Sequence, residues 1–181
     1  MMTRALSSDI LYDSALEAFT SLFSNGEHYY YVSLLIGGDG RRPFISGWSN
    51  EALERERRAA RQDGECSEWV RWSYADSPYC DFSAESFSEV EALFADYPEI
   101  DRLSVDEWDE ELRFRLDEME AAVRRLDDDG IFSVNQERDE ILVGVEVVPP
   151  DYSNTLRARR LNSEGNRALM RWLREAAEEP L

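Results

Sequence analysis

An apolar stripe between residues 105 and 126 constrains the fold more than any other feature of this sequence. Its members follow one another at steps of three and four residues, which is the spacing of a buried helical face. Ser104 and Glu107 have the spacing of a capping box, and Gly130 follows the last turn as a stop signal. The stripe predicts a long helix that must pack against a larger core. Its residues are Val105, Trp108, Leu112, Leu116, Met119, Val123 and Leu126.

The remaining segments alternate between helix and strand periodicity. Apolar spacing predicts helices at residues 8–23, 51–62 and 161–177, and a capping box formed by Ser86 and Glu89 opens another helix that closes at Pro98. Aromatic and β-branched runs predict strands at residues 29–36, 43–48 and 68–72 and a late hairpin made of residues 131–134 and 140–148. This order predicts one α+β domain over residues 1–181, with a mostly antiparallel sheet flanked by helices. Within it we expect an acidic helical segment at about 84–129, then the hairpin and the last helix at about 130–177.

The charge balance excludes several classes of function. The chain has 181 residues, with 39 acidic and 20 basic side chains and a net charge of −19. Because a bare nucleic acid requires a basic face, we expect no direct contact with DNA or RNA. A single histidine and two cysteines argue against a zinc site of the usual kind, so we expect neither a metal nor a cofactor.

Targeting signals are also lacking in the sequence. The first residues contain no apolar core of signal-peptide length, and no stretch approaches the length of a membrane span. Cys66 and Cys80 lie 14 residues apart without a CxxC motif, so we interpret them as reduced thiols. We therefore expect a cytoplasmic protein that does not contact membranes.

Acidic residues concentrate in the middle of the chain. Residues 85–129 contain 17 acidic residues against 5 arginines. One interpretation is a solvated face that keeps the protein soluble. The other is a docking surface for a basic protein, because a field of one sign speeds encounter and selects partners. No EF-hand spacing supports a calcium site. The candidate docking acids are Asp106, Glu107, Glu110, Glu111 and Glu118.

Aromatic residues form a second candidate group. Trp48, Trp69, Trp72, Tyr74 and Tyr79 are large rings of the kind that favours interfaces and pockets; the plainer interpretation is ordinary core and sheet-face packing. We include Trp48, Trp72 and Tyr74, with Asp76 from the same loop, among the candidate partner-binding residues.

Two further motifs point to chemistry, each with a plainer alternative. His28 is the one candidate general base, and Cys80 is a candidate nucleophile that would pair with it. The plainer interpretation is a histidine at a strand end and a structural thiol. The run at residues 37–42, Gly-Gly-Asp-Gly-Arg-Arg, superficially suggests a phosphate loop, but a strand follows it where such loops need a helix, so we expect a hairpin turn.

Several short motifs resemble a known family. Residues 30–34 (YYVSL), 43–53 (PFISGWSNEAL) and 71–73 (RWS), with the later GIF at 130–132 and RLN at 160–162, resemble a bacterial domain-of-unknown-function family, the one numbered 4303. The loop at residues 72–77 reads WSYADS and departs from the family's Trp-Ser-Pro-Ala-Glu/Asp-Trp run at Tyr74 and Ser77. The resemblance brings no activity with it. Small acidic bacterial domains of this kind resemble antitoxin or immunity proteins.

These observations favour a non-enzymatic binding module. We expect an immunity-type or regulatory protein whose acidic face covers the cationic groove of a basic partner, such as a toxin domain. The alternatives are a small enzyme that uses carboxylates with His28 or Cys80, and an acidic scaffold subunit without an inhibitory role.

Overall fold

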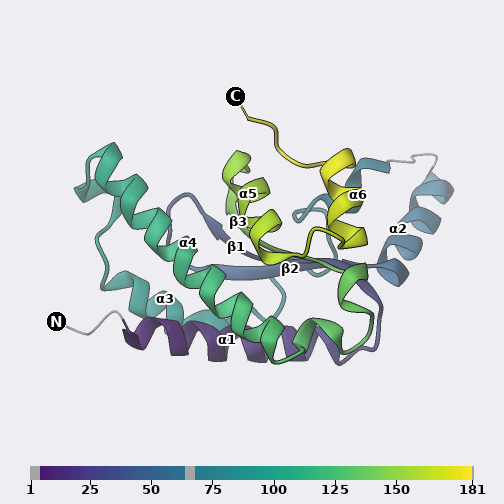
Figure 1. The fold of residues 1–181 in the computed structure, drawn as a ribbon, viewed down its shortest axis with the longest axis horizontal. Coiled ribbons are helices and arrows are strands. Elements are labelled where there is room, and N and C mark those ends of the chain that lie inside the picture. Colours follow the sequence, from purple (N-terminus) through teal and green to yellow (C-terminus); the bar gives the residue numbers. More distant parts are fainter. Residues whose placement is uncertain (1–4, 64–67, 181) are drawn as a thin grey trace.

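The computed structural model of the protein describes residues 5–63 and 68–180. It contains a three-stranded sheet with helices on both faces (Figure 1). The strands are β1 (Tyr29–Gly37), β2 (Pro43–Ser49) and β3 (Leu142–Val148). The α-helices are α1 (Ala5–Phe23), α2 (Asn50–Asp63), α3 (Ser88–Ala95), α4 (Val105–Asp128), α5 (Tyr152–Leu161) and α6 (Arg167–Glu175). Five short 3-10 turns connect them: η1 (Glu68–Trp72), η2 (Ala84–Phe87), η3 (Ile100–Arg102), η4 (Ile131–Ser133) and η5 (Arg138–Glu140).

The α+β class is confirmed, but the sheet is mixed rather than mostly antiparallel. Its strand order is β2-β1-β3. β1 pairs antiparallel with β2 through the predicted tight turn and parallel with β3. A parallel pair requires the chain to cross over between the two strands. Here α2, α3 and α4 lie on the path between β2 and β3.

Two of the predicted strands are 3-10 turns. Residues 68–72 form η1, and residues 131–133 form η4, so the predicted late hairpin is wrong. Side chains take the place of strand pairing after η4. The Gln136 side chain accepts a hydrogen bond from the Tyr29 backbone N–H at 3.0 Å and donates one to the Phe132 carbonyl at 2.6 Å. The backbone N–H at the start of β1 therefore has its acceptor without a further strand.

The predicted last helix, at residues 161–177, begins six residues later than expected as α6, and α5 before it was not predicted. α5 ends at Leu161 and α6 starts at Arg167, with Asn166 as its N-cap. The Ser86 capping box is also absent, because Ser86 lies inside η2 and α3 begins at Ser88 without a side-chain cap. By contrast, the Ser104–Glu107 box at the start of α4 has both of its reciprocal hydrogen bonds.

Two apolar clusters hold the helices against the sheet. On one face α1, α3 and α4 pack over Val32, Leu34, Val143 and Val145 (Figure 1). On the other face α2, α5 and α6 contribute to a smaller cluster around Trp48. The predicted stripe of α4 lies in the larger cluster from Leu116 onward; Leu112 is only partly buried, and Val105 at the first turn is 77% exposed.

Candidate functional site

The predicted acids all lie on α4, but only some of them face solvent. Asp106, Glu107 and Glu110 are exposed. Glu107 has a structural task, because its carboxylate accepts hydrogen bonds from the Ser104 hydroxyl and backbone N–H, and these bonds lower the pKa of Glu107. Glu118 is half-buried. Asp106 and Glu110 are thus the predicted acids that are free to meet a partner.

Glu111 does not belong to that surface. It is 9% exposed, and its carboxylate accepts a hydrogen bond from Arg115 Nε at 3.0 Å. The two residues are one turn apart on α4, which is the spacing of a favourable ion pair. Counting acids along the sequence could not separate Glu111 from its exposed neighbours, because its burial depends on Arg115.

The predicted aromatic residues lie elsewhere, at the β2 side of the sheet. Trp48 has no exposed surface, and its indole N–H donates to the Ser73 carbonyl at 2.8 Å, so it is a core residue and not a contact for a partner. Trp72 is half-buried; it packs edge-on against Tyr30 and donates to Glu175 at 2.8 Å.

Tyr74 and Asp76 complete the predicted aromatic loop. Tyr74 is half-buried, with its ring beside Phe44, and its carbonyl accepts a hydrogen bond from Ser46. Asp76 is exposed. Cys66 and the side chain of Trp69 lie outside the described part of the structure. The helix α4 packs against α1, α5, β1 and β3, so the acidic and aromatic predictions do not form one site.

The residues of the enzyme alternative are not brought together. His28 Nδ1 lies 2.8 Å from the Glu51 carboxylate, and the His28 side chain is largely exposed. Burial raises the pKa of the Cys80 thiol, which disfavours the reactive thiolate. Over residues 5–63 and 68–180, no contact joins His28 to Cys80, and no group of three or more His, Cys, Asp or Glu side chains is placed to hold a metal ion.

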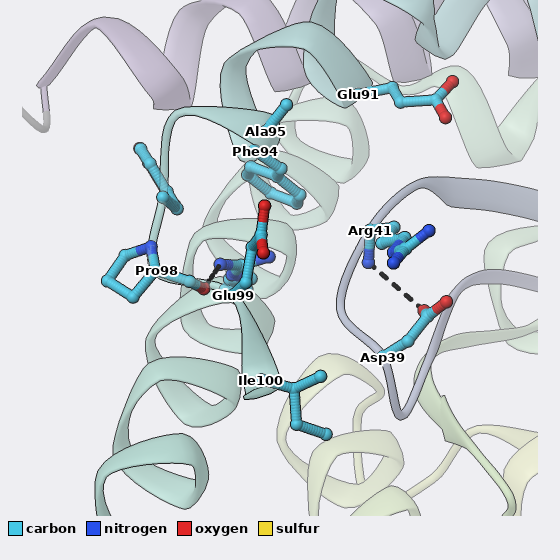
Figure 2. A pocket seen from close by; sticks show the side chains of 10 residues that line it. Asp39, Arg41, Glu91, Phe94, Ala95, Pro98, Glu99 and Ile100 are labelled. Carbon is cyan, nitrogen blue, oxygen red and sulfur yellow. Dashed lines mark hydrogen bonds between the residues drawn. The ribbon is translucent and has the colours of Figure 1, made fainter. Parts of the chain in front are cut away.

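A cavity at the α3–α4 end of the molecule is lined in part by exposed acids. Its volume is about 310 Å³. Phe94 and Ala95 of α3 and the following connection form one wall, and the turn between β1 and β2 forms the other (Figure 2). Ionisable side chains contributed by both walls line it, namely Asp39, Arg41, Glu91, Glu99 and Arg115.

Arg115 forms the base of this cavity. It is 2% exposed, and its guanidinium carbon lies 5.0 Å from the centre of the Phe94 ring, 5.3 Å from that of Tyr97 and 5.4 Å from that of Trp108. Rings at these distances stabilise a cation. The Arg115 guanidinium is thus already surrounded by aromatic faces, and it acts as a fixed part of the cavity wall.

Arg115 also ties three segments together. Besides Glu111 it donates to the carbonyls of Gly40 at 2.6 Å and Pro98 at 3.1 Å (Figure 2 shows the second bond). Gly40 has a φ of +67°, and a Cβ there would lie 2.6 Å from the Trp108 ring. The turn can approach α4 this closely because residue 40 is glycine. The cavity is therefore held by a fixed network before any ligand arrives.

The rim of the cavity combines unpaired charge with exposed apolar surface. Asp39, Glu91 and Glu99 are exposed, and Glu91 has no ion-pair partner among the described residues. Ile100 in the lining is 39% exposed, and Val105, five residues later at the start of α4, is 77% exposed. Carboxylates around an apolar edge suit a cationic side chain with a hydrocarbon stem.

A comparison with known protein families identifies the family of this chain. The model of a domain of unknown function, DUF4303, matches residues 11–163. The chain belongs to the DUF4303 family. The match includes the whole sheet, the α3–α4 cavity and helix α5, while α6 lies beyond it. No curated protein and no solved structure was found to match the chain. In the described part of this DUF4303 protein, no helix has the length and apolarity to cross a membrane.

Sequence reasoning missed Arg115, the central residue of the cavity in this DUF4303 protein. A signal was present, because residue 115 lies seven positions after Trp108 and four before Met119 and so falls on the apolar stripe. An arginine on a buried stripe requires a carboxylate and backbone acceptors, and Glu111 four residues earlier supplies the carboxylate.

Proposed function

We propose that this DUF4303 protein is a non-enzymatic binding module that docks a basic protein partner through its α3–α4 end. The docking surface consists of the cavity above Arg115, the exposed apolar residues Ile100 and Val105, and the exposed acids around them. The observation that supports the proposal most is the number of unpaired carboxylates at this end.

The charges of this end are not neutralised internally. Of the five arginines in residues 85–129, Arg115 is buried against Glu111, and Arg102, Arg124 and Arg125 form ion pairs with carboxylates. Several exposed acids have no ion-pair partner among the described residues, namely Glu89, Glu91, Asp96, Asp106, Asp109 and Glu110. Unpaired charges of one sign create a field that extends about 8 Å into physiological salt solution. Such a field accelerates encounter with a basic surface and disfavours acidic competitors.

Affinity needs desolvated contacts in addition to charge, because exposed ion pairs contribute little. The apolar rim supplies them. An arginine or lysine of the partner would enter the cavity with its stem against Ile100 and its head near Glu91 and Glu99. Covering the cationic groove of a partner in this way is the mode of action of an immunity-type or regulatory protein.

Capture from the native host tests the proposal. The bait is the full chain, compared with a triple variant Glu91→Gln, Asp106→Asn and Glu110→Gln. A matched control carries Glu17→Gln, Glu164→Gln and Glu179→Gln, three exposed acids outside residues 85–129 that also lack ion-pair partners within the described part of the chain. We expect a basic protein that the wild type and the control retain and the triple variant loses. Equal recovery by all three baits would contradict the proposed surface.

A further inference from the structure

A groove between α4 and α5 has the opposite character to the acidic end. Its volume is about 560 Å³. Four arginines line it, Arg113 and Arg124 from α4 and Arg157 and Arg160 from α5. The two acids in its wall are Asp117 and Glu120. In a chain with a net charge of −19, this groove holds four guanidinium groups against two carboxylates.

Arg157 is a buried cation without a salt bridge. It is 6% exposed, and no carboxylate oxygen of the described residues lies within 4.0 Å of its guanidinium nitrogens. All of its hydrogen bonds go to neutral acceptors. Nε donates to the Val145 carbonyl at 2.9 Å, and Nη2 donates to Ser153 Oγ at 2.8 Å and to Asn154 Oδ1 at 2.7 Å.

The third nitrogen of Arg157 is left for a ligand. Nη1 has no hydrogen-bond partner among the described residues. It is not fully buried, so a ligand in the groove can reach it. A buried charge without an opposite charge is costly, and an anion bound in the groove would relieve that cost. Burial also lowers the pKa of Arg157, as expected for a desolvated cation.

Two more arginines are held in position around Glu120. Arg160 donates to both Glu120 oxygens, at 3.0 and 2.7 Å, and Arg124 donates to one of them at 2.6 Å. Burial raises the pKa of Glu120, but these hydrogen bonds outweigh it, so its pKa lies below the usual range. Glu120 is therefore ionised and orients both guanidiniums. Each of the two arginines keeps at least one nitrogen without a partner, and Arg113 has no partner at all among the described residues.

We propose that this groove binds a phosphate group. Guanidinium groups recognise phosphate through pairs of parallel hydrogen bonds, and several of them can share one phosphate dianion. Leu156, which is 41% exposed, and Ala121 border the same groove and would contact the carbon part of a phosphate ester. The site is independent of the proposed docking surface, because it has the opposite charge and uses none of the residues assigned to that surface.

Calorimetric titration of the full chain at constant ionic strength tests this assignment. The probes are inorganic phosphate and glycerol 3-phosphate, with malonate as a dicarboxylate of similar charge. We expect saturable binding of the phosphates at one site per chain and weaker binding of malonate. Tighter binding of the ester than of inorganic phosphate identifies an organic phosphate as the ligand, and equal binding identifies free phosphate. Absence of saturable phosphate binding, or binding of malonate as tight as that of phosphate, would overturn the proposal.

Single arginine variants locate the binding site. Arg113→Gln leaves every described hydrogen bond intact, so its fold is expected to be unchanged, and Arg124→Gln removes one bond to Glu120. Each is expected to weaken phosphate binding roughly tenfold, as the loss of a charge-assisted hydrogen bond does. Arg159→Gln is the matched control, since Arg159 is exposed on α5 and does not line the groove. A loss equal to that of Arg113→Gln in this control would mean that phosphate is attracted only by general charge, and would overturn the site.

Discussion

The side chain of Asn162 pairs with the backbone of Val143 as a neighbouring strand would. Its Nδ2 donates to the Val143 carbonyl at 2.8 Å, and its Oδ1 accepts the Val143 N–H at 3.1 Å. Asn154 makes the same pair of bonds with Val147, at 3.1 and 2.8 Å. Arg157 donates to Val145 between them. Helix α5 therefore covers the open edge of β3. This matters because an exposed strand edge can pair with another chain and cause aggregation.

We first predict that Asn162→Ala destabilises the protein by about 2–4 kcal/mol. The substitution leaves both backbone groups of buried Val143 without partners, and each such group costs about 1–3 kcal/mol. Urea unfolding at neutral pH measures the change. Asn50→Ala is the control, because exposed Asn50 makes only one long side-chain bond, 3.3 Å to the His28 carbonyl. A loss below about 0.5 kcal/mol for Asn162→Ala, the range of an ordinary surface substitution, would contradict the edge-pairing role.

A second prediction concerns the buried ion pair beneath the cavity. Arg115→Met leaves Glu111 as an uncompensated buried carboxylate and the Gly40 and Pro98 carbonyls without their donor. We expect a loss of about 3–5 kcal/mol. The double variant Arg115→Met/Glu111→Leu removes both charges and is expected to lose less than the single variant. If chemical denaturation shows equal losses in both, Glu111 is not held by Arg115.

A third prediction separates packing from recognition on helix α4. Leu116 is buried in the large cluster, so Leu116→Ala is expected to cost about 2–5 kcal/mol through lost burial and the cavity left behind. Glu110 is exposed, so Glu110→Gln is expected to change stability by no more than about 0.5 kcal/mol. Thermal unfolding of both variants decides this. A large loss in Glu110→Gln would assign that acid to the fold instead of the docking surface.

A fourth prediction concerns pH and Glu146, which lies beside Tyr31 on the sheet. Burial raises the pKa of Glu146 to about 7, although the hydroxyls of Ser33 and Tyr31 and the charge of Arg157 act in the opposite direction; Glu178 adds to the rise. The folded state therefore holds a proton between about pH 4.5 and 7 that the unfolded state has released. Stability must then fall as pH rises through this window and level off above it.

Glu146→Gln tests that sign. Glutamine does not ionise and still accepts the hydrogen bond from Tyr31, which is 2.9 Å long in the wild type. We expect the variant to be about 3 kcal/mol more stable than the wild type at pH 8 and nearly equal at pH 4.5, since a rise of the pKa from 4.5 to about 7 corresponds to about 1.4 kcal/mol per pH unit. Urea unfolding curves across this pH range give the comparison. A constant difference at all pH values would show that Glu146 does not titrate in this window.

The sequence predicted those elements whose signals are local. Strands β1 and β2, their glycine turn, helix α2 and the capped start of α4 all lie where periodicity and capping residues place them. Each depends on residues within one or two turns of one another. The buried second half of the α4 stripe follows for the same reason, because 3.6-residue periodicity is a local property.

The sequence-based predictions are wrong where residues far apart in the chain determine the structure. Whether β3 pairs parallel or antiparallel with β1 depends on the path of the intervening residues 38–141, which no local pattern encodes. Asparagine is a residue type that commonly caps helices, yet the Asn162 side chain pairs with the backbone of β3. Asn166 caps α6 and also donates to the Arg138 and Ile141 carbonyls. The burial of Trp48 likewise involves a distant partner, the Ser73 carbonyl, and the Arg115 that pairs with Glu111 is held by the distant Gly40 and Pro98 carbonyls.

The most direct test of the docking proposal is the association rate with the captured partner, measured by stopped flow at increasing salt concentration. The wild-type rate constant is expected to fall steeply from low to physiological salt, because screening removes the attraction of the unpaired acids. The Glu91→Gln, Asp106→Asn, Glu110→Gln variant is expected to associate more slowly at low salt and to depend less on salt, while the Glu17, Glu164 and Glu179 control keeps the wild-type slope. A wild-type rate that does not change with salt, or a triple variant with the wild-type rate and slope, would contradict an acidic docking surface at the α3–α4 end.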